Sequence, residues 1–218
     1  MENLQPNSLK QSLGRKIFRN FLEANGFDRS VQDKFDTLTE LYMRVNNVIN
    51  ISALRTFDDI YIKHYLDSIY PYKYFDGSCC DVGCGGGFPC LPLSIVTDLP
   101  FTGIDGVGKK LILIKNCKQE LALNNIECEH IRAEELSKRG KKFDTVCSRA
   151  LACTDKALAF CAPLAEKNGK IILYKTQNDE PASITVANRY NVKLIETVDY
   201  TLPETNINRR LFIYSKLL

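Results

Sequence analysis

The chain has 218 residues, of which 44% are hydrophobic and 25% are charged, and its formal net charge is +3. No apolar run approaches the roughly 20 residues that a membrane-spanning helix needs, so we expect no membrane domain. The polar N-terminal segment also lacks the apolar core of a signal peptide, which predicts a cytoplasmic protein.

The first 75 residues are predicted to be helical. Apolar residues recur at helical spacing over 9–22 and 31–45, and a third helical segment begins near residue 56. Gly26 suits the C-terminal cap of the first segment, whereas Ser30 and Thr56 suit the N-terminal caps of the other two. We therefore expect a helical extension over 1–75 that packs on a core domain over 76–218.

From residue 76 onward, short apolar strands alternate with helical stretches. The last two strands, 191–200 and 208–218, are separated only by a loop, which predicts a hairpin. We therefore expect an α/β fold with a seven-stranded, mostly parallel sheet and a C-terminal antiparallel hairpin. This is the Rossmann-like strand pattern of class I S-adenosylmethionine-dependent methyltransferases. The alternating strands are predicted at 78–82, 100–105, 126–132, 143–148 and 169–175, with helices over 89–96, 109–123, 134–139 and 154–167.

The first of these strands runs into the glycine-rich turn DVGCGGGFPC, residues 81–90. Gly83 and Gly85 match the first two glycines of the dinucleotide-binding fingerprint, but Phe88 stands at the position of the third. Asp105 ends the second strand, where its carboxylate can bind the ribose hydroxyls of a dinucleotide or of S-adenosylmethionine. The spacing alone therefore leaves both ligands open.

Two features of the turn favour S-adenosylmethionine. Asp81 precedes the glycines, and its carboxylate can serve the ammonium group of the cofactor, directly or through water. Phe88 adds bulk where a pyrophosphate would need room, and Pro89 fits the first turn of the following helix. A tight turn that binds no ligand stays open as the structural alternative.

Further contacts are expected at the carboxyl ends of the next strands, where open α/β sheets hold their ligands. Ala133 and Glu134 follow the third strand and can border an adenine, although Glu134 also suits the N-terminus of a helix. Arg149 follows the fourth strand, where a methyl acceptor would enter. It can bind a phosphate, guanine O6 and N7, or the cofactor carboxylate, and a structural ion pair is the alternative.

The residues around Arg149 narrow the chemistry of the acceptor. The D/N-P-P-Y/F motif of amino-group methylases is absent, as are the clustered acids of metal-dependent O-methyltransferases. Cys147 lacks the preceding proline that is typical of cytosine C5 methylases, and we expect it to face the core. Guanine N7 has no proton to lose and needs no general base, so the sequence is consistent with N7 as the acceptor.

The cysteines and histidines argue against a metal site. The nine cysteines are odd in number and form no C-x-x-C motif, and His64 and His130 are the only histidines. We expect reduced, mostly buried thiols and no bound metal.

Basic residues form clusters that can neutralise phosphates, although solvated faces are the plainer interpretation. The clusters are Arg15, Lys16 and Arg19; Lys109, Lys110, Lys115 and Lys118; Lys138, Arg139, Lys141 and Lys142; and Arg209 and Arg210.

Four segments together resemble the bacterial GidB family, the ribosomal RNA small subunit methyltransferases G. They are NISALRTFDDIYIKHYLDSI (50–69), DVGCGGGFPCLPLSI (81–95), RAEE (132–135) and FDTVCSRALA (143–152), the last followed by Lys175. The resemblance covers roughly residues 31–216. It implies transfer of a methyl group from S-adenosylmethionine to N7 of a guanosine in 16S rRNA. The implied partner is 16S rRNA or the small ribosomal subunit, and we expect a monomer.

The resemblance also assigns cofactor contacts by position. They fall on Gly83, Phe88, Ala133, Glu134 and Arg149. The chain departs from the family pattern at three positions: Cys90 replaces a glycine, Gly106 a serine, and Thr176 a glycine.

His64 and Asp67, three residues apart on one predicted helix, suggest a buried hydrogen-bonded pair. The resemblance puts this helix beside the cofactor pocket, which adds the hypothesis that the pair helps to close the site over RNA. Two other functions stay open. One is an NAD(P)-dependent oxidoreductase, against which Phe88 and the terminal hairpin argue, and the other is a non-catalytic RNA-binding or assembly factor.

Overall fold

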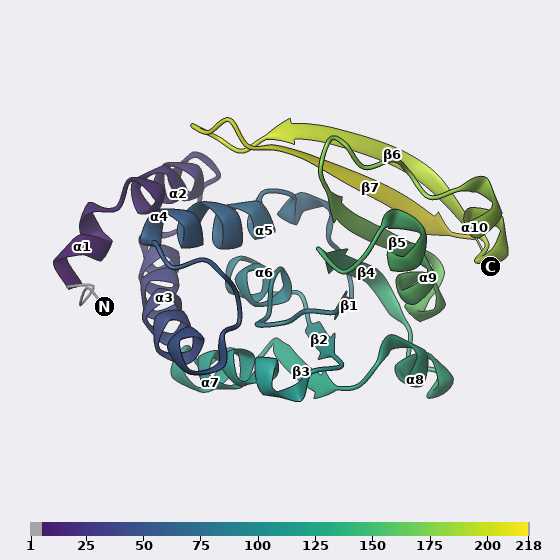
Figure 1. Ribbon diagram of the computed structural model, residues 1–218, viewed down its shortest axis with the longest axis horizontal. Coiled ribbons are helices and arrows are strands. Elements are labelled where there is room, and N and C mark those ends of the chain that lie inside the picture. Colours follow the sequence, from purple (N-terminus) through teal and green to yellow (C-terminus); the bar gives the residue numbers. More distant parts are fainter. Residues whose placement is uncertain (1–5, 218) are drawn as a thin grey trace.

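The structure is a computed structural model that describes residues 6–217. Seven strands form one sheet in the order β3-β2-β1-β4-β5-β7-β6 (Figure 1). Strands β1 to β5 are parallel, and β7 runs antiparallel to both β5 and β6. The expected sheet and its C-terminal hairpin are therefore confirmed. The strands are β1 Cys79–Val82, β2 Phe101–Asp105, β3 Ile126–His130, β4 Phe143–Arg149, β5 Ala165–Lys175, β6 Val192–Thr201 and β7 Asn208–Lys216.

Helices cover both faces of the sheet, with one cluster of buried apolar side chains under each layer. Neighbouring residues of β1 point to opposite faces, so that Cys79 joins one cluster and Cys80 the other. The first layer holds α2 (Leu13–Ala24), α3 (Arg29–Ile49), α6 (Cys90–Val96) and α7 (Ile112–Glu120), and the second holds α8 (Ala133–Lys138), α9 (Thr154–Cys161) and α10 (Ile184–Arg189).

The N-terminal helices share the first cluster with the sheet. The division of the chain at residue 75 into an extension and a core domain stays a prediction. Where one helix was expected near the N-terminus, α1 (Pro6–Gln11) and α2 are separated by Ser12, whose hydroxyl caps α2 by accepting from Arg15 N. The N-cap of α3 is Asp28 rather than the expected Ser30, because the Asp28 carboxylate accepts from Ser30 N at 2.8 Å. The Thr56 cap is confirmed.

The third helical segment is not a regular α-helix. It runs as α4 (Phe57–Asp59), a π-helical stretch η1 (Ile60–Leu66) and α5 (Asp67–Ile69). Such wide turns are rare and frequently occur at functional sites. His64 therefore lies in the π-helical stretch, and Asp67 begins the α-helical turn that follows.

Several helices and strands of the segment 76–218 begin or end at other residues than predicted. The helix expected over 154–167 ends at Cys161 and continues as a 3₁₀ turn to Leu164, so that β5 begins at Ala165. Pro89 precedes α6 rather than lying in its first turn. The short helix α10 was not predicted; the Ser183 hydroxyl caps it by accepting from Val186 N. The remaining short helices are the 3₁₀ turns η2 (Tyr72–Tyr74), η3 (Gly108–Leu111) and η4 (Ala162–Leu164).

The structure also bears on the membrane and metal predictions. Among the described helices, none is both long and apolar enough to cross a membrane. Over residues 6–217, no three His, Cys, Asp or Glu side chains gather as a metal site would require. All nine cysteines are free thiols, and Cys147 is buried in β4 as expected.

Candidate functional site

The glycine-rich turn after β1 adopts a conformation that depends on its glycines. Gly83, Gly85 and Gly87 have φ angles of +72°, +56° and +101°, a region that other residues rarely adopt. A Cβ atom on Gly83 would lie 2.5 Å from the Leu151 side chain. The Asp105 carboxylate, at the end of β2, accepts hydrogen bonds from Gly85 N at 2.9 Å and Val107 N at 2.7 Å. Asp105 thus ties the turn to the neighbouring strand.

Asp81 lies beneath this turn and is completely buried. Its Oδ2 accepts a hydrogen bond from Cys90 N at 3.1 Å, whereas Oδ1 has no hydrogen-bond partner among the described residues. Burial raises the pKa of the Asp81 carboxyl to about 6, although the bond from Cys90 works in the opposite direction. An unsatisfied buried carboxylate oxygen is unfavourable unless a ligand or water completes it.

A cavity of about 90 Å³ opens at the carboxyl ends of β1, β2 and β3. It brings together four of the predicted cofactor residues, Gly83, Asp105, Ala133 and Glu134. Gly85 does not line the cavity, but its N–H donates a hydrogen bond to Asp105, which does. The cavity is further lined by residues that the sequence did not single out as contacts: Val82, Ile104, Gly106, Ile131, Arg132, Leu151 and Phe160. Its lining combines apolar side chains with the carboxylates of Asp105 and Glu134 at strand ends, which suits contacts to the edge of the adenosine part of S-adenosylmethionine; the cavity is smaller than a whole nucleoside, so it can hold only part of that group.

Phe88 lies outside this cavity, in the protein interior. Its ring stacks on the imidazole of His64, with centroids 4.1 Å apart and planes 9° from parallel. The guanidinium carbon of Arg149 lies 5.7 Å from the centroid of the same ring. Phe88 therefore connects the glycine-rich turn to the residues around Arg149.

A second, larger cavity of about 440 Å³ lies beside the first, at the carboxyl ends of β4 and β5. Leu151 is the one residue that lines both cavities. The second cavity is lined by Lys63, His64, Asp67, Arg149, Ala150, Leu151, Ala152, Tyr174, Lys175, Thr176, Asp179 and Arg209. Of these residues, Arg149, His64 and Asp67 were predicted from the sequence to belong to the site, whereas Arg209 was predicted only as part of a basic cluster.

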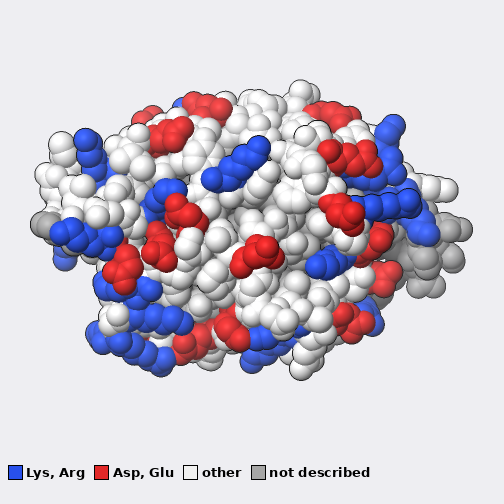
Figure 2. All heavy atoms as spheres, turned by 180° about the vertical axis from the view of Figure 1, so that it is seen from behind, with Lys and Arg blue, Asp and Glu red and all other residues white. Residues whose placement is uncertain are grey.

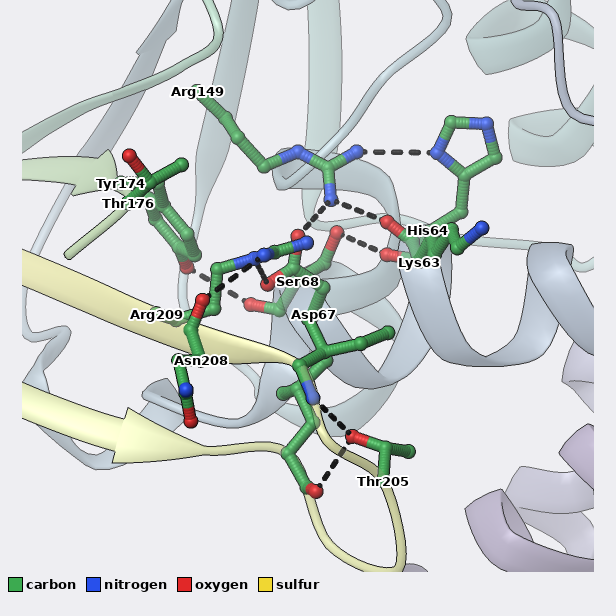
Figure 3. A network of polar contacts seen from close by, with 12 residues as sticks. Lys63, His64, Asp67, Ser68, Arg149, Tyr174, Thr176, Thr205, Asn208 and Arg209 are labelled. Carbon is green, nitrogen blue, oxygen red and sulfur yellow. Dashed lines mark hydrogen bonds and ion pairs between the residues drawn. The ribbon is translucent and has the colours of Figure 1, made fainter. Parts of the chain in front are cut away.

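Arg149 is held in the second cavity by three groups (Figure 3). Its Nη1 donates to Lys63 O at 3.0 Å and to Asp67 Oδ2 at 3.2 Å, and its Nη2 lies 3.2 Å from His64 Nδ1. We expected His64 and Asp67 to bond to one another; instead, each contacts Arg149. These contacts to Nη1 and Nη2 fix the plane of the guanidinium. Among the described residues, Nε of Arg149 has no hydrogen-bond partner.

His64 is a neutral hydrogen-bond acceptor in this arrangement. Burial and, to a smaller extent, the nearby Arg149 charge lower the pKa of His64 to about 3. A guanidinium only donates hydrogen bonds, so Nδ1 accepts from Arg149, and Nε2 then carries the proton toward Ser52 Oγ at 3.0 Å. His64 therefore has both ring nitrogens engaged and no free nitrogen for proton transfer.

The cysteines near the site are not poised for nucleophilic chemistry. Burial raises the pKa of the Cys147 and Cys90 thiols well above the usual value. Since the thiolate is the reactive form, neither side chain suits covalent catalysis. Cys90 is completely buried beside Gly103.

The outer surface shows no single basic face in the view from behind. Figure 2 shows Lys and Arg side chains interspersed with Asp and Glu over this side of the molecule. On this face, therefore, no basic patch stands apart from the acidic side chains.

Comparisons with known proteins agree with this geometry. The model of the GidB family, described as rRNA small subunit methyltransferase G, matches residues 31–212. The ribosomal RNA small subunit methyltransferase G of Lysinibacillus sphaericus is 31% identical over 94% of this chain and 92% of its own. The Lactobacillus acidophilus protein of the same name is 32% identical over 90% and 89%. Among solved structures, magnesium protoporphyrin IX methyltransferase from Synechocystis, with bound SAH, aligns with a TM-score of 0.57 at 15% identity, over 93% of this chain and 99% of that one.

Proposed function

Because the chain belongs to the rRNA small subunit methyltransferase G family, we propose that it transfers a methyl group to N7 of a guanosine in 16S rRNA. It is an S-adenosylmethionine-dependent rRNA methyltransferase, and family membership excludes the oxidoreductase alternative. On this proposal the partner is 16S rRNA or the small ribosomal subunit, and the protein acts in the cytoplasm. A monomeric state stays a prediction.

We assign the cofactor and the RNA base to different cavities. Asp105, Ala133 and Glu134 would hold the adenosine at the smaller cavity, and the guanine would enter the larger cavity beside Arg149. When bound, S-adenosylmethionine supplies an electrophilic methyl group on a sulfonium. Leu151 stands between the two cavities, so it borders the path along which the methyl group passes.

One observation supports N7 over acceptors that must lose a proton: the acids and the histidine of the larger cavity are already engaged. Asp67 bonds to two arginines, His64 is bonded through both ring nitrogens, and Asp179 accepts from Thr176. Each of the three is thus paired with cations or donors of the protein itself, which disfavours it as a general base. Guanine N7 attacks through a lone pair, so positioning supplies the catalysis. Arg149 can donate to guanine O6 from Nε or from the remaining Nη2 hydrogen.

The acceptor atom can be tested directly. Purified protein is incubated with labelled S-adenosylmethionine and small subunits from a strain that lacks this activity, and the modified base is then mapped. We expect one 7-methylguanosine in 16S rRNA. Label on another atom would overturn the N7 assignment. Cofactor binding without transfer to any ribosomal substrate would favour the non-catalytic alternative.

Replacing His64 tests whether its acceptor nitrogen orients Arg149. His64→Phe keeps an aromatic ring against Phe88 but removes the acceptor, and we expect kcat to fall about 10- to 100-fold with little change in cofactor affinity. His64→Asn, which retains an acceptor near the position of Nδ1, should recover part of the rate. Methylation kinetics and calorimetry with the cofactor provide the two measurements. If both variants keep the wild-type methylation rate and RNA affinity, His64 does not orient Arg149 for catalysis.

A further inference from the structure

The larger cavity contains one carboxylate that two arginines share. Asp67 accepts from Arg149 Nη1 at its Oδ2, at 3.2 Å, and from Arg209 Nε at its Oδ1, at 2.9 Å (Figure 3). The Asp67 side chain is 8% exposed, and those of Arg149 and Arg209 are 13% and 24% exposed. The single negative charge of Asp67 therefore lies between the two positive charges of Arg149 and Arg209, in a largely buried part of the cavity.

The other cations of the cavity already have partners of their own. Lys63 Nζ lies 2.5 Å from Asp59 Oδ1, and Lys175 Nζ lies 3.9 Å from Asp179 Oδ1. His64 is neutral and contributes no charge. The excess positive charge is therefore carried by Arg149 and Arg209, and an anion that enters the cavity would neutralise it.

The two arginines differ in how much of each guanidinium is left for a ligand. Arg149 is bonded on three sides, whereas Arg209 donates from Nε to Asp67 and from Nη1 to Asn208 O. Over residues 6–217, the Nη2 atom of Arg209 has no hydrogen-bond partner. Arg209 is also the more exposed of the two. Its guanidinium can therefore donate to an anion without losing its bond to Asp67.

We propose that Arg209 forms a phosphate subsite, which binds a phosphodiester of the RNA next to the methylated guanosine. This inference rests on the proposed function, since it makes RNA the occupant of the cavity. The carboxylate of the cofactor is the other anion to consider. It would lie near the turn after β1, and β7 is three strands away in the sheet, about 14 Å. Arg209 does not line the smaller cavity, so the RNA phosphate is the better match.

Arg210, the next residue of β7, provides a matched control. Its guanidinium forms a two-bond pair with Asp199, at 2.7 and 2.8 Å, and donates to Gln177 O and Asp179 O. It is already neutralised and lies outside the residues that line the cavity. The two arginines therefore have the same charge and neighbouring positions, but only Arg209 is available to an anion.

The test compares Arg209→Gln, Arg209→Lys and Arg210→Gln in the full-length protein. Binding to unmodified small subunits is measured over a salt series, together with KM, kcat and cofactor affinity. For Arg209→Gln we expect about a tenfold higher KM for subunits and a salt dependence reduced by roughly one phosphate contact, with cofactor affinity unchanged. Arg209→Lys should restore most of the salt dependence, and Arg210→Gln should keep it.

Two outcomes would overturn the phosphate subsite. One is an unchanged salt dependence in a folded Arg209→Gln protein, and the other is a loss of cofactor affinity equal to the loss in KM, which would assign the anion to the cofactor. Because subunit binding is read without methyl transfer, the result is independent of the methylated atom. A product other than 7-methylguanosine would therefore overturn the proposed acceptor while leaving a phosphate contact at Arg209 intact.

Discussion

Arg149→Gln should lower kcat for methyl transfer by about 10²- to 10³-fold, because a positioned donor facing the reacting base would be lost. The side chain is held by Lys63 O, Asp67 and His64, so its orientation is set before RNA arrives. Glutamine is too short and carries no charge, and it cannot make these contacts together. Methylation of small subunits under single-turnover conditions measures the effect.

A lysine at the same position separates charge from geometry. Arg149→Lys keeps the positive charge next to Asp67 but loses the planar donor set, so we expect less than a tenfold recovery over Arg149→Gln. Calorimetry with S-adenosylmethionine shows whether part of the loss comes from cofactor binding, as the family pattern implies. A fall of less than threefold in a folded Arg149→Gln variant would reduce Arg149 to a structural ion pair.

Asp81→Asn should make the protein more stable at neutral pH and weaken its binding of the cofactor. Folding raises the pKa of this carboxyl from 3.8 to about 6, so the folded chain prefers the protonated form. The stability linked to Asp81 is fully present below about pH 4 and is lost as the pH rises through 6. A shift of about two units corresponds to about 3 kcal/mol at pH 7.5, which asparagine would recover.

Chemical unfolding of wild type and Asp81→Asn at several pH values checks this prediction. The difference between them should be small below about pH 4, reach about 1 kcal/mol near pH 4.5 and level off above about pH 6.5. Asp33→Asn, at an exposed carboxylate on α3, serves as the control. The cofactor should bind Asp81→Asn less tightly, since the buried carboxylate has an oxygen left for the ammonium group. If Asp81→Asn is no more stable than wild type at pH 7.5, burial of the Asp81 carboxylate does not destabilise the folded protein at that pH.

The sheet could be predicted from the sequence because its signals are local. Each parallel strand is a short apolar run bounded by polar turns, and the absence of a long helix between β6 and β7 indicated the hairpin. The predicted ends of helices and strands were wrong where a nearby side chain or proline determines where the element begins or ends. Asp28 rather than Ser30 caps α3, and Pro163 follows the early end of α9, after which β5 begins.

The site was predictable only in part. Residues that follow strand ends, such as Asp105 and Arg149, meet at one edge because parallel strands end there. Arg209 could not be selected in the same way, since its role depends on an antiparallel strand that brings it to Asp67, 142 residues earlier in the chain. The contact of both His64 and Asp67 with Arg149 is likewise a tertiary property. The spacing of three residues on one helix wrongly suggested that they bond to each other.

The distribution of thiols has a practical consequence for studying this protein. Seven of the nine cysteines are buried and Cys128 is half-buried, whereas Cys153 is exposed. Cys153 directly follows Ala152, which lines the larger cavity, and it is the residue before the first turn of α9, where its side chain makes no capping hydrogen bond. A maleimide fluorophore should therefore attach mainly at this natural position. Its emission would report the arrival of RNA in real time, without an engineered cysteine and separately from catalysis.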